Sequence, residues 1–187
     1  MNVDHGQIRV KLRELGAVCE IPMRLMRRNN FDYPDDRLDK VNGWIRIRDE
    51  GNKVTLGYKQ LDHRGLHGTK EVSVAVGDFD KAQKLLLAIG LKQKSYQETK
   101  RESWRLGNVE IELDEWPWIM PFVELESQNE EELKDIAQKL GLDWLKVVHG
   151  SVEIVYQTEY DVTEAEVDGW PEIKFGSVPS WLEKLRK

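Results

Sequence analysis

The sequence is poor in the residue types that mark several protein classes. Cys19 is the only cysteine among 187 residues, so neither an internal disulfide framework nor a cysteine metal cluster is available. No apolar run approaches the roughly 20 residues that a membrane-spanning helix needs, and the N-terminal stretch MNVDHGQIRVKL is too polar for a signal peptide. The net charge of −6 argues against a nucleic-acid or membrane partner. We expect a cytoplasmic protein, for which a homodimer stays open.

The chain nevertheless has the composition of a protein with a buried core. Hydrophobic residues make up 40% of it and charged residues 33%, and its length suits one domain over 1–187, with a helical C-terminal cover at 163–187. Cap residues and apolar spacing predict helices at 4–15, 79–89 and 130–140, and short ones at 164–168 and 181–186.

Most of the remaining chain alternates polar and apolar residues, which predicts strands. They cover GWIRIRDEG, KVTLGYKQ, KEVSVAV, SYQETKRESWRL, the two halves of EIELDEWPWIMPFVELE, HGSVEIVYQTEY and the extended segment MRLMRRNNFDY. Hairpin-connected strands with a few helices predict an α+β fold, an antiparallel sheet or β-barrel with helices packed outside.

The charged positions of these strands segregate by sign. One group of strands carries basic residues at these positions, namely Arg46, Arg48, Lys59 and Arg101. Another group carries acidic residues, namely Glu110, Glu112, Asp114, Glu124 and Glu126. In one curved sheet they would form a cavity with a cationic and an anionic wall, which suits a polyphosphate bound with a divalent metal. The alternative is a solvated face, because cross-strand Arg–Glu pairs contribute only ~0.2–1 kcal/mol each.

Four motifs together resemble one known family. GWIRIRDEGNKVTLGYKQ, KEVSV, QETKRESW and VEIELDEWPWIMPFVELE occur in that order, and the chain from about 20 to 160 is similar to the CYTH family of class IV adenylate cyclases and thiamine triphosphatases, within the triphosphate tunnel metalloenzymes. The resemblance implies a CYTH-like antiparallel barrel of about eight strands, a small-molecule triphosphate substrate, and Mg²⁺ or Mn²⁺.

The resemblance also implies roles for particular residues, although it identifies no catalytic residue. Those that match phosphate ligands of the family are Arg46, Arg48, Lys59 and Arg101. Those that match its metal ligands are Asp114, Glu124 and Glu126, and Glu112 is in phase with them.

Three positions depart from the family pattern. The family begins with a strand bearing Glu-x-Glu-x-Lys, but only MNV precedes the helix expected at 4–15, so either the chain starts late or this member lacks that strand. Thr99 stands at the Lys of the family's Lys-x-Arg strand, and Ser73 stands where an acidic residue is expected.

Three functions remain open at this point. A metal-dependent phosphohydrolase of a triphosphate (tripolyphosphate, thiamine triphosphate or a nucleotide) comes first, and a class IV-type adenylate cyclase that makes cyclic AMP from ATP comes second. A module that binds polyphosphate or a nucleotide without turnover is the third, because the first motif is missing.

Three further predictions concern residues outside these motifs. Trp116 and Trp118 are expected to pack over one end of the sheet rather than stack on a base. His63 and His67 are expected to lie in a loop without metal, because Gly65 and Gly68 oppose a helix there. Cys19 follows two apolar residues and is expected to be buried.

Overall fold

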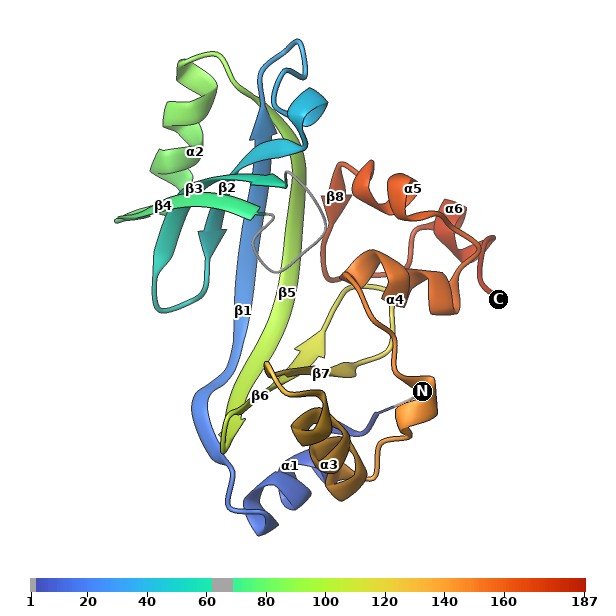
Figure 1. The fold of residues 1–187 in the computed structure, drawn as a ribbon. Coiled ribbons are helices and arrows are strands. Elements are labelled where there is room, and N and C mark those ends of the chain that lie inside the picture. Colours follow the sequence, from blue (N-terminus) through green and yellow to red (C-terminus); the bar gives the residue numbers. More distant parts are fainter. Residues whose placement is uncertain (1–2, 62–68) are drawn as a thin grey trace. The chain divides into compact units, whose positions relative to one another are not determined.

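The computed structural model describes residues 3–61 and 69–187, so His63 and His67 lie outside the described residues. The chain forms two compact units. The first comprises Met1–Arg24, Thr99–Asp168 and Phe175–Lys187, and the second comprises Leu25–Glu98 and Gly169–Lys174. Strands β1 (Val18–Asp32) and β5 (Lys92–Leu106) contribute to both units and run side by side (Figure 1). The hydrogen-bonded strand order is β4-β3-β2-β1-β5-β6-β7, and β8 pairs with β5.

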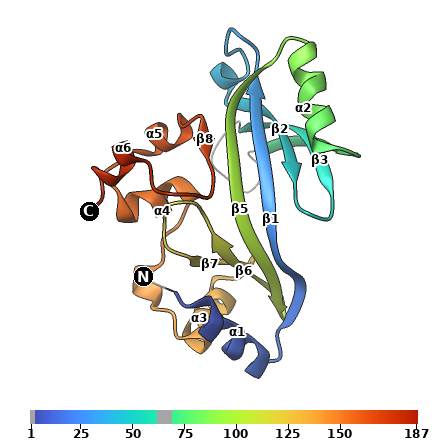
Figure 2. The same cartoon turned by 180° about the vertical axis from the view of Figure 1, so that it is seen from behind.

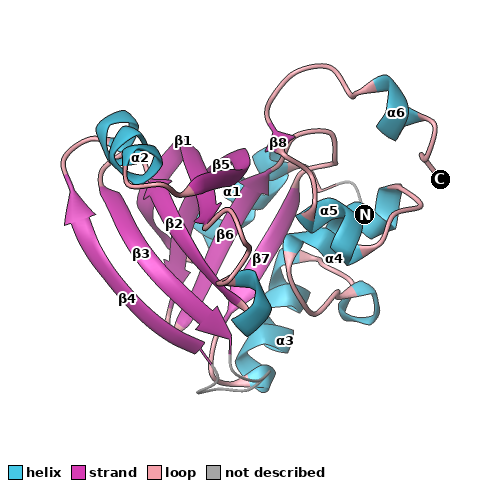
Figure 3. Ribbon diagram, turned by 90° about the horizontal axis from the view of Figure 1, so that it is seen from above, coloured by secondary structure: helices cyan, strands magenta, loops and turns pink. Residues whose placement is uncertain are grey.

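The second unit is built on an antiparallel meander. Strands β2 (Gly43–Asp49), β3 (Val54–Leu61) and β4 (Thr69–Val76) lie next to one another, and β2 pairs with the second half of β1 (Figure 3). The short 3₁₀ helix η1 (Asp39–Val41) precedes β2, and helix α2 (Phe79–Ala88) follows β4. The two-residue strand β8 (Glu172–Ile173) pairs with β5 in parallel.

Helix α2 covers the apolar face of this meander. Phe79, Ala82 and Leu86 recur at helical spacing and pack with Phe31 and Ile47 in one buried cluster. Asp78 caps the helix by accepting a hydrogen bond from the Lys81 backbone amide. Since side chains alternate along a strand, burial of Ile47 against α2 places its neighbours in β2 on the opposite face.

The first unit combines a second antiparallel ladder with most of the helices. Its strands are the end of β5, β6 (Val109–Glu115) and β7 (Phe122–Glu126). Figure 2 shows α1 and α3 beside these strands. Its helices are α1 (His5–Glu14), α3 (Glu130–Leu140), η2 (Trp144–Lys146), α4 (Val152–Glu159), α5 (Glu164–Asp168) and α6 (Ser180–Glu183).

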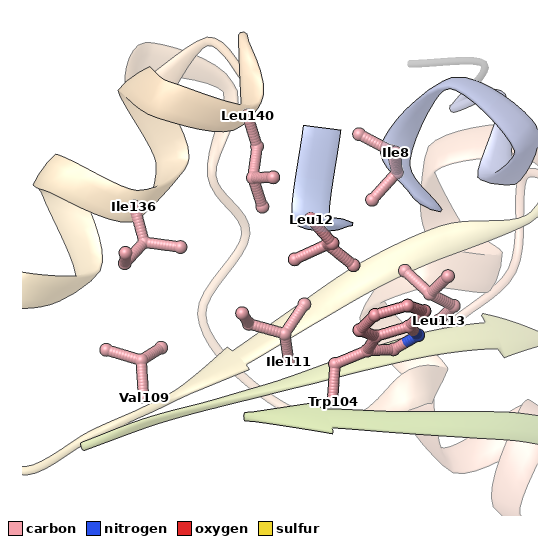
Figure 4. Close-up of a cluster of buried hydrophobic side chains, with 8 residues drawn as sticks. All are labelled: Ile8, Leu12, Trp104, Val109, Ile111, Leu113, Ile136 and Leu140. Atoms are coloured by element: carbon pink, nitrogen blue, oxygen red, sulfur yellow. The ribbon is translucent and has the colours of Figure 1, made fainter. Parts of the chain in front are cut away.

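The core of the first unit lies between the ladder and helices α1 and α3. It contains the buried side chains of Ile8, Leu12, Trp104, Val109, Ile111, Leu113, Ile136 and Leu140 (Figure 4). The odd-numbered residues of β6 therefore face the helices, and Glu110, Glu112 and Asp114 face away from them. Asp4 caps α1 by accepting hydrogen bonds from the backbone amides of Gly6 and Gln7, and Thr163 and Glu166 exchange hydrogen bonds at the start of α5.

The prediction of a strand over HGSVEIVYQTEY is wrong, because Val152–Glu159 form helix α4. Tyr156 lies in α4, Tyr160 is the C-cap residue that follows it in an extended conformation, and both side chains are completely buried. Their hydroxyl groups donate to the carbonyl oxygens of Pro117 and Trp118, in the turn between β6 and β7. This tertiary contact outweighs the strand propensity of Val152, Ile154 and Val155.

Two smaller predictions are also corrected. Cys19 is exposed, because the start of β1 turns it away from the core. The last helix, α6, covers Ser180–Glu183 rather than the predicted 181–186. Trp116 is buried, as the packing interpretation expected.

The predicted α+β class, with antiparallel strands and helices outside the sheet, is confirmed. Among residues 3–61 and 69–187, no helix is long and apolar enough to cross a membrane.

Candidate functional site

A cationic face lies on the second unit, opposite helix α2. In the ladder between β1 and β2, Arg28 lies directly opposite Arg48 and Asn30 lies opposite Arg46. Arg46 in turn lies opposite Gly57 in β3. Like charges directly across a ladder are destabilising. The fold therefore maintains a concentration of positive charge that its own stability does not require.

Arg46 is the residue of this face whose charge is least compensated. Its side chain is half-buried, and it makes no hydrogen bond or ion pair with any described residue. Burial, reinforced by the charge of Arg48, lowers the pKa of Arg46. A Cβ atom at Gly57, across from it, would meet the Val72 carbonyl oxygen at 3.1 Å. Glu71 and Glu50 act on Arg46 only through their charge and accept no hydrogen bond from it, so its donors are available to an anion.

The other two predicted phosphate ligands of this unit already have carboxylate partners. Arg48 Nη1 lies 3.5 Å from Glu50 Oε1, and Lys59 Nζ lies 2.8 Å from Glu71 Oε2. These side chains are partly exposed, so the pairs are weak and exchangeable.

The acidic residues lie on the first unit, on the face of β5, β6 and β7 that points away from α1 and α3. The register aligns them in three rows across the ladder. The rows are Arg101–Asp114–Phe122, Ser103–Glu112–Glu124 and Arg105–Glu110–Glu126. This face carries more carboxylates than guanidinium groups, so an additional cation would be stabilised there.

Arg101 holds two of the predicted metal ligands. Its Nε and Nη2 atoms donate to Asp114 Oδ1 and Oδ2 at 2.7 and 2.6 Å, and Nη2 also donates to Glu124 Oε2 at 2.7 Å. Burial favours the neutral guanidine, but the hydrogen bonds and charge of Asp114 outweigh it and raise the pKa of Arg101. Asp114 has no exposed surface, so the plain solvated-face interpretation does not hold for this residue.

The carboxyl groups of Glu112 and Glu124 are destabilised in their charged form by burial and by neighbouring carboxylates. Burial raises the pKa of both carboxyl groups; Arg101 opposes the rise at Glu124, whereas Asp114 and Glu126 add to it. Glu112 Oε2 is buried and has no hydrogen-bond partner within the part of the chain that the structure describes. An oxygen of this kind is suited to a hard cation.

Glu126 lies at the solvent-facing end of the acidic rows. It is exposed and lines a pocket of about 640 Å³ together with Glu110 and Glu132, and with Asn108, Ser127, Gln128 and Asn129. Arg105, in the same row, donates to Glu110 at 2.6 Å and to Glu20 at 2.7 Å. In the row Arg105–Glu110–Glu126, Arg105 is therefore paired with carboxylates, whereas the Glu126 carboxylate is exposed to solvent.

The donor set fits a divalent metal that arrives with a phosphate ligand. No group of three or more His, Cys, Asp or Glu residues in the described ranges is arranged to hold a metal ion alone. Mg²⁺, however, is commonly held by one or two carboxylates together with waters and substrate phosphates, rather than by an all-protein cage. Glu124, Glu126 and the unpartnered oxygen of Glu112 meet that lower requirement.

A further set of residues escaped the sequence analysis. Glu20, Pro22 and Arg24 alternate along β1 with the spacing of the expected Glu-x-Glu-x-Lys motif, with Pro in place of the second Glu and Arg in place of Lys. Arg24 Nη1 donates to the Arg101 carbonyl oxygen at 3.0 Å. The sequence prediction places this motif before the first helix, whereas β1 follows α1; the alternation of Glu20 with Arg24 is the local signal for it.

Solved structures share this fold at low sequence identity. A candidate adenylate cyclase from Vibrio parahaemolyticus matches with a TM-score of 0.62 at 16% identity, covering 82% of this chain and 92% of that one. The PH1012 protein from Pyrococcus horikoshii OT3 matches at 0.58 with 24% identity, covering 79% and 90%. HpAC1 from Hippeastrum, a candidate adenylyl cyclase described with a dominant triphosphatase activity, matches at 0.57 with 15% identity, covering 83% and 91%.

The family model for the CYTH domain matches residues 30–153, more than half of the chain. A search of curated proteins found no significant relative. The match begins after Glu20–Arg24, where the first motif departs from the family pattern, and it includes every predicted phosphate and metal ligand. The chain therefore belongs to the CYTH domain family.

Proposed function

We propose that this protein is a metal-dependent phosphohydrolase that acts on a small-molecule triphosphate. The proposal rests on membership of the CYTH family and on the two charged faces described above. The half-buried guanidinium of Arg46, which makes no hydrogen bond or ion pair within residues 3–61 and 69–187, is the observation that carries it, because burial of a cation is costly unless an anion binds it.

The residues divide by charge into two tasks. Arg46, Arg48 and Lys59 would bind phosphate oxygens, the last two by exchanging Glu50 and Glu71 for the substrate. Arg101 would bind a further phosphate oxygen. Glu124 and Glu126, with Glu112, would hold Mg²⁺ or Mn²⁺, which when bound neutralises phosphate charge and polarises the phosphoryl group. The residues contribute by positioning and by charge stabilisation, as is general for phosphoryl transfer.

A phosphate-release assay tests the proposal. Tripolyphosphate, thiamine triphosphate and ATP would each be incubated with the protein, with Mn²⁺, with Mg²⁺ and with EDTA. We expect phosphate release from at least one substrate that requires the metal and falls at least tenfold in Glu124→Gln. Asp135→Asn is a matched control, because Asp135 is an exposed carboxylate paired with Lys139 on α3. Release that is equal with EDTA would contradict the proposal.

An adenylate cyclase of class IV type is the second candidate. The Vibrio parahaemolyticus and Hippeastrum proteins, whose folds this chain shares, are both candidate cyclases. The same charges would serve either reaction, because they bind the triphosphate and its metal. In the ATP arm of the assay, cyclic AMP and pyrophosphate identify the cyclase, whereas ADP or AMP with phosphate identifies the hydrolase.

Binding without turnover is a third outcome with its own structural basis. The Glu20–Pro22–Arg24 spacing lacks the second carboxylate of the family's first motif, so the metal could have too few ligands for catalysis. Saturable tripolyphosphate binding with no product from any substrate would identify this module. In each case the proposed partner is a small triphosphate in the cytoplasm, with no nucleic-acid or membrane partner, and a homodimer remains to be tested by sedimentation.

A further inference from the structure

Asp114 differs from the other predicted metal ligands in its access to solvent. Its side chain is 1% exposed, whereas that of Glu124 is 37% exposed. Both of its oxygens already accept hydrogen bonds from the Arg101 guanidinium. A metal ion that entered from solvent would have to displace Arg101 before it reached Asp114.

The pair of Arg101 and Asp114 is set by the backbone as well as by charge. The two residues lie directly opposite each other in the β5–β6 ladder, so their side chains leave the sheet on the same face. A bidentate Arg–carboxylate pair fixes the plane of the guanidinium, which a single hydrogen bond would not do. Asp114 therefore determines where the remaining edge of Arg101 points.

That remaining edge is the nitrogen Nη1. Arg101 uses Nε and one Nη2 hydrogen for Asp114 and its second Nη2 contact for Glu124, while Nη1 donates to no residue in the described part of the chain. The side chain is 23% exposed, so solvent reaches part of it. A guanidinium has five donors in a planar fork, and two of them are left for an anion.

We infer that Asp114 is a positioning residue for Arg101 and not a metal ligand. It holds one edge of the guanidinium so that the Nη1 edge receives a phosphate oxygen of the substrate. This removes Asp114 from the metal set and leaves that role to Glu124, Glu126 and Glu112. The inference rests on the proposed function, in that the ligand is a triphosphate.

The two possible roles of Asp114 predict opposite changes in triphosphate affinity when Asp114 is neutralised in the absence of metal. If Asp114 were only a metal ligand, neutralising it would remove a negative charge near a polyanion, and triphosphate would bind equally or more tightly. If Asp114 orients Arg101, neutralising it frees the guanidinium and weakens binding. The experiment is calorimetric titration of tripolyphosphate into the protein in EDTA.

We expect Asp114→Asn to weaken tripolyphosphate binding at least tenfold in EDTA, and Asp135→Asn, at an exposed carboxylate paired with Lys139, to leave it unchanged. Arg101→Lys should weaken it similarly, because an ammonium lacks the fork. In the Arg101→Lys background, Asp114→Asn should then change the affinity less than twofold, because Asp114 acts through Arg101. A general structural defect would instead weaken binding equally in both backgrounds.

Unchanged or tighter binding by Asp114→Asn would overturn the inference, and so would a wild-type protein that binds no tripolyphosphate in EDTA. If Asp114→Asn does not fold, Asp114→Glu can replace it in the experiment. This variant keeps the charge but displaces the Arg101 guanidinium, and the same loss of tripolyphosphate affinity is expected. Turnover is not needed for any of these outcomes. A protein that binds as expected but releases no phosphate would refute the hydrolase and leave the role of Asp114 intact.

Discussion

At the scale of single residues, the informative charges are those whose partners are missing or unusually complete. Arg46 is half-buried and makes no hydrogen bond or ion pair with a described residue. It lies on the same face of β2 as Arg48, whose charge lowers its pKa further. Asp114, in contrast, is completely buried and fully occupied by Arg101. A half-buried charge that no described residue pairs reduces stability, which indicates a role in binding rather than in folding.

Replacement of Arg46 should therefore separate function from stability. We expect Arg46→Gln to weaken tripolyphosphate binding at least tenfold, or about 1.4 kcal/mol, while the thermal midpoint stays the same or rises because repulsion from Arg48 is removed. Calorimetry and thermal unfolding measure the two effects. Arg37→Gln is the matched control, since Arg37 forms an exposed pair with Asp35. A large fall in the midpoint of Arg46→Gln would show a structural role instead.

At the scale of elements, helix α1 is anchored to the sheet by one buried carboxylate. Glu102 in β5 accepts from Arg9 Nε at 3.0 Å and from Trp104 Nε1 at 2.6 Å, and its side chain is 8% exposed. Burial tends to raise the pKa of Glu102, but the hydrogen bonds from Arg9 and Trp104 outweigh it, so the pKa is lowered on folding.

A lowered folded-state pKa contributes stability that is present above the unfolded pKa and is lost as pH falls through the folded value. We expect Glu102→Gln to lower the free energy of unfolding by about 1–3 kcal/mol at pH 7. The difference from wild type should shrink as the pH falls below the ordinary glutamate pKa of about 4.3 and through the lowered pKa of the folded state. Urea unfolding at pH 7 and pH 3.5 measures it. A difference that is independent of pH would contradict this explanation, and Asp135→Asn should change stability by less than about 0.5 kcal/mol at both values.

At the scale of the whole molecule, charge is segregated rather than merely abundant. The net charge is −6, yet the cationic residues Arg28, Arg46 and Arg48 share one face of the second unit. A local cationic face on an acidic protein favours a small, dense anion over an extended one, because a long polyanion would also meet the acidic surface.

Two ligands of different size test this selectivity. Tripolyphosphate in EDTA, at 100 times its dissociation constant, should stabilise the protein by about 2.7 kcal/mol, visible as a higher thermal midpoint. A 20-base-pair DNA duplex at physiological salt should give no shift and no change in fluorescence anisotropy, since phosphate-driven binding needs a basic surface. Binding of the duplex would contradict the assignment of a small-molecule partner.

Local pattern was sufficient for most of the fold. Helices α1, α2 and α3, which Asp4, Asp78 and Asn129 cap, begin at or within one residue of their predicted starts, and period-two alternation identified strands β2 to β7. It failed at α4, where the strand propensity of Val152 and Ile154 gives way to burial of Tyr156 and Tyr160 against the turn after β6. That turn is 39 residues away from Tyr156, so no local pattern contains this information.

The sequence by itself determined which residues carry charge, in which phase of which strand, and therefore which family the chain resembles. Side-chain direction follows from a strict period of two, which is a local property of the backbone. Only the tertiary structure decided how those charges pair. It gave Arg46 no hydrogen-bond or ion-pair partner among the described residues and buried Asp114 against Arg101, because ladder register and burial depend on residues far apart in the chain. The roles of phosphate ligand, metal ligand and positioning residue differ in these contacts, although the residue types are the same.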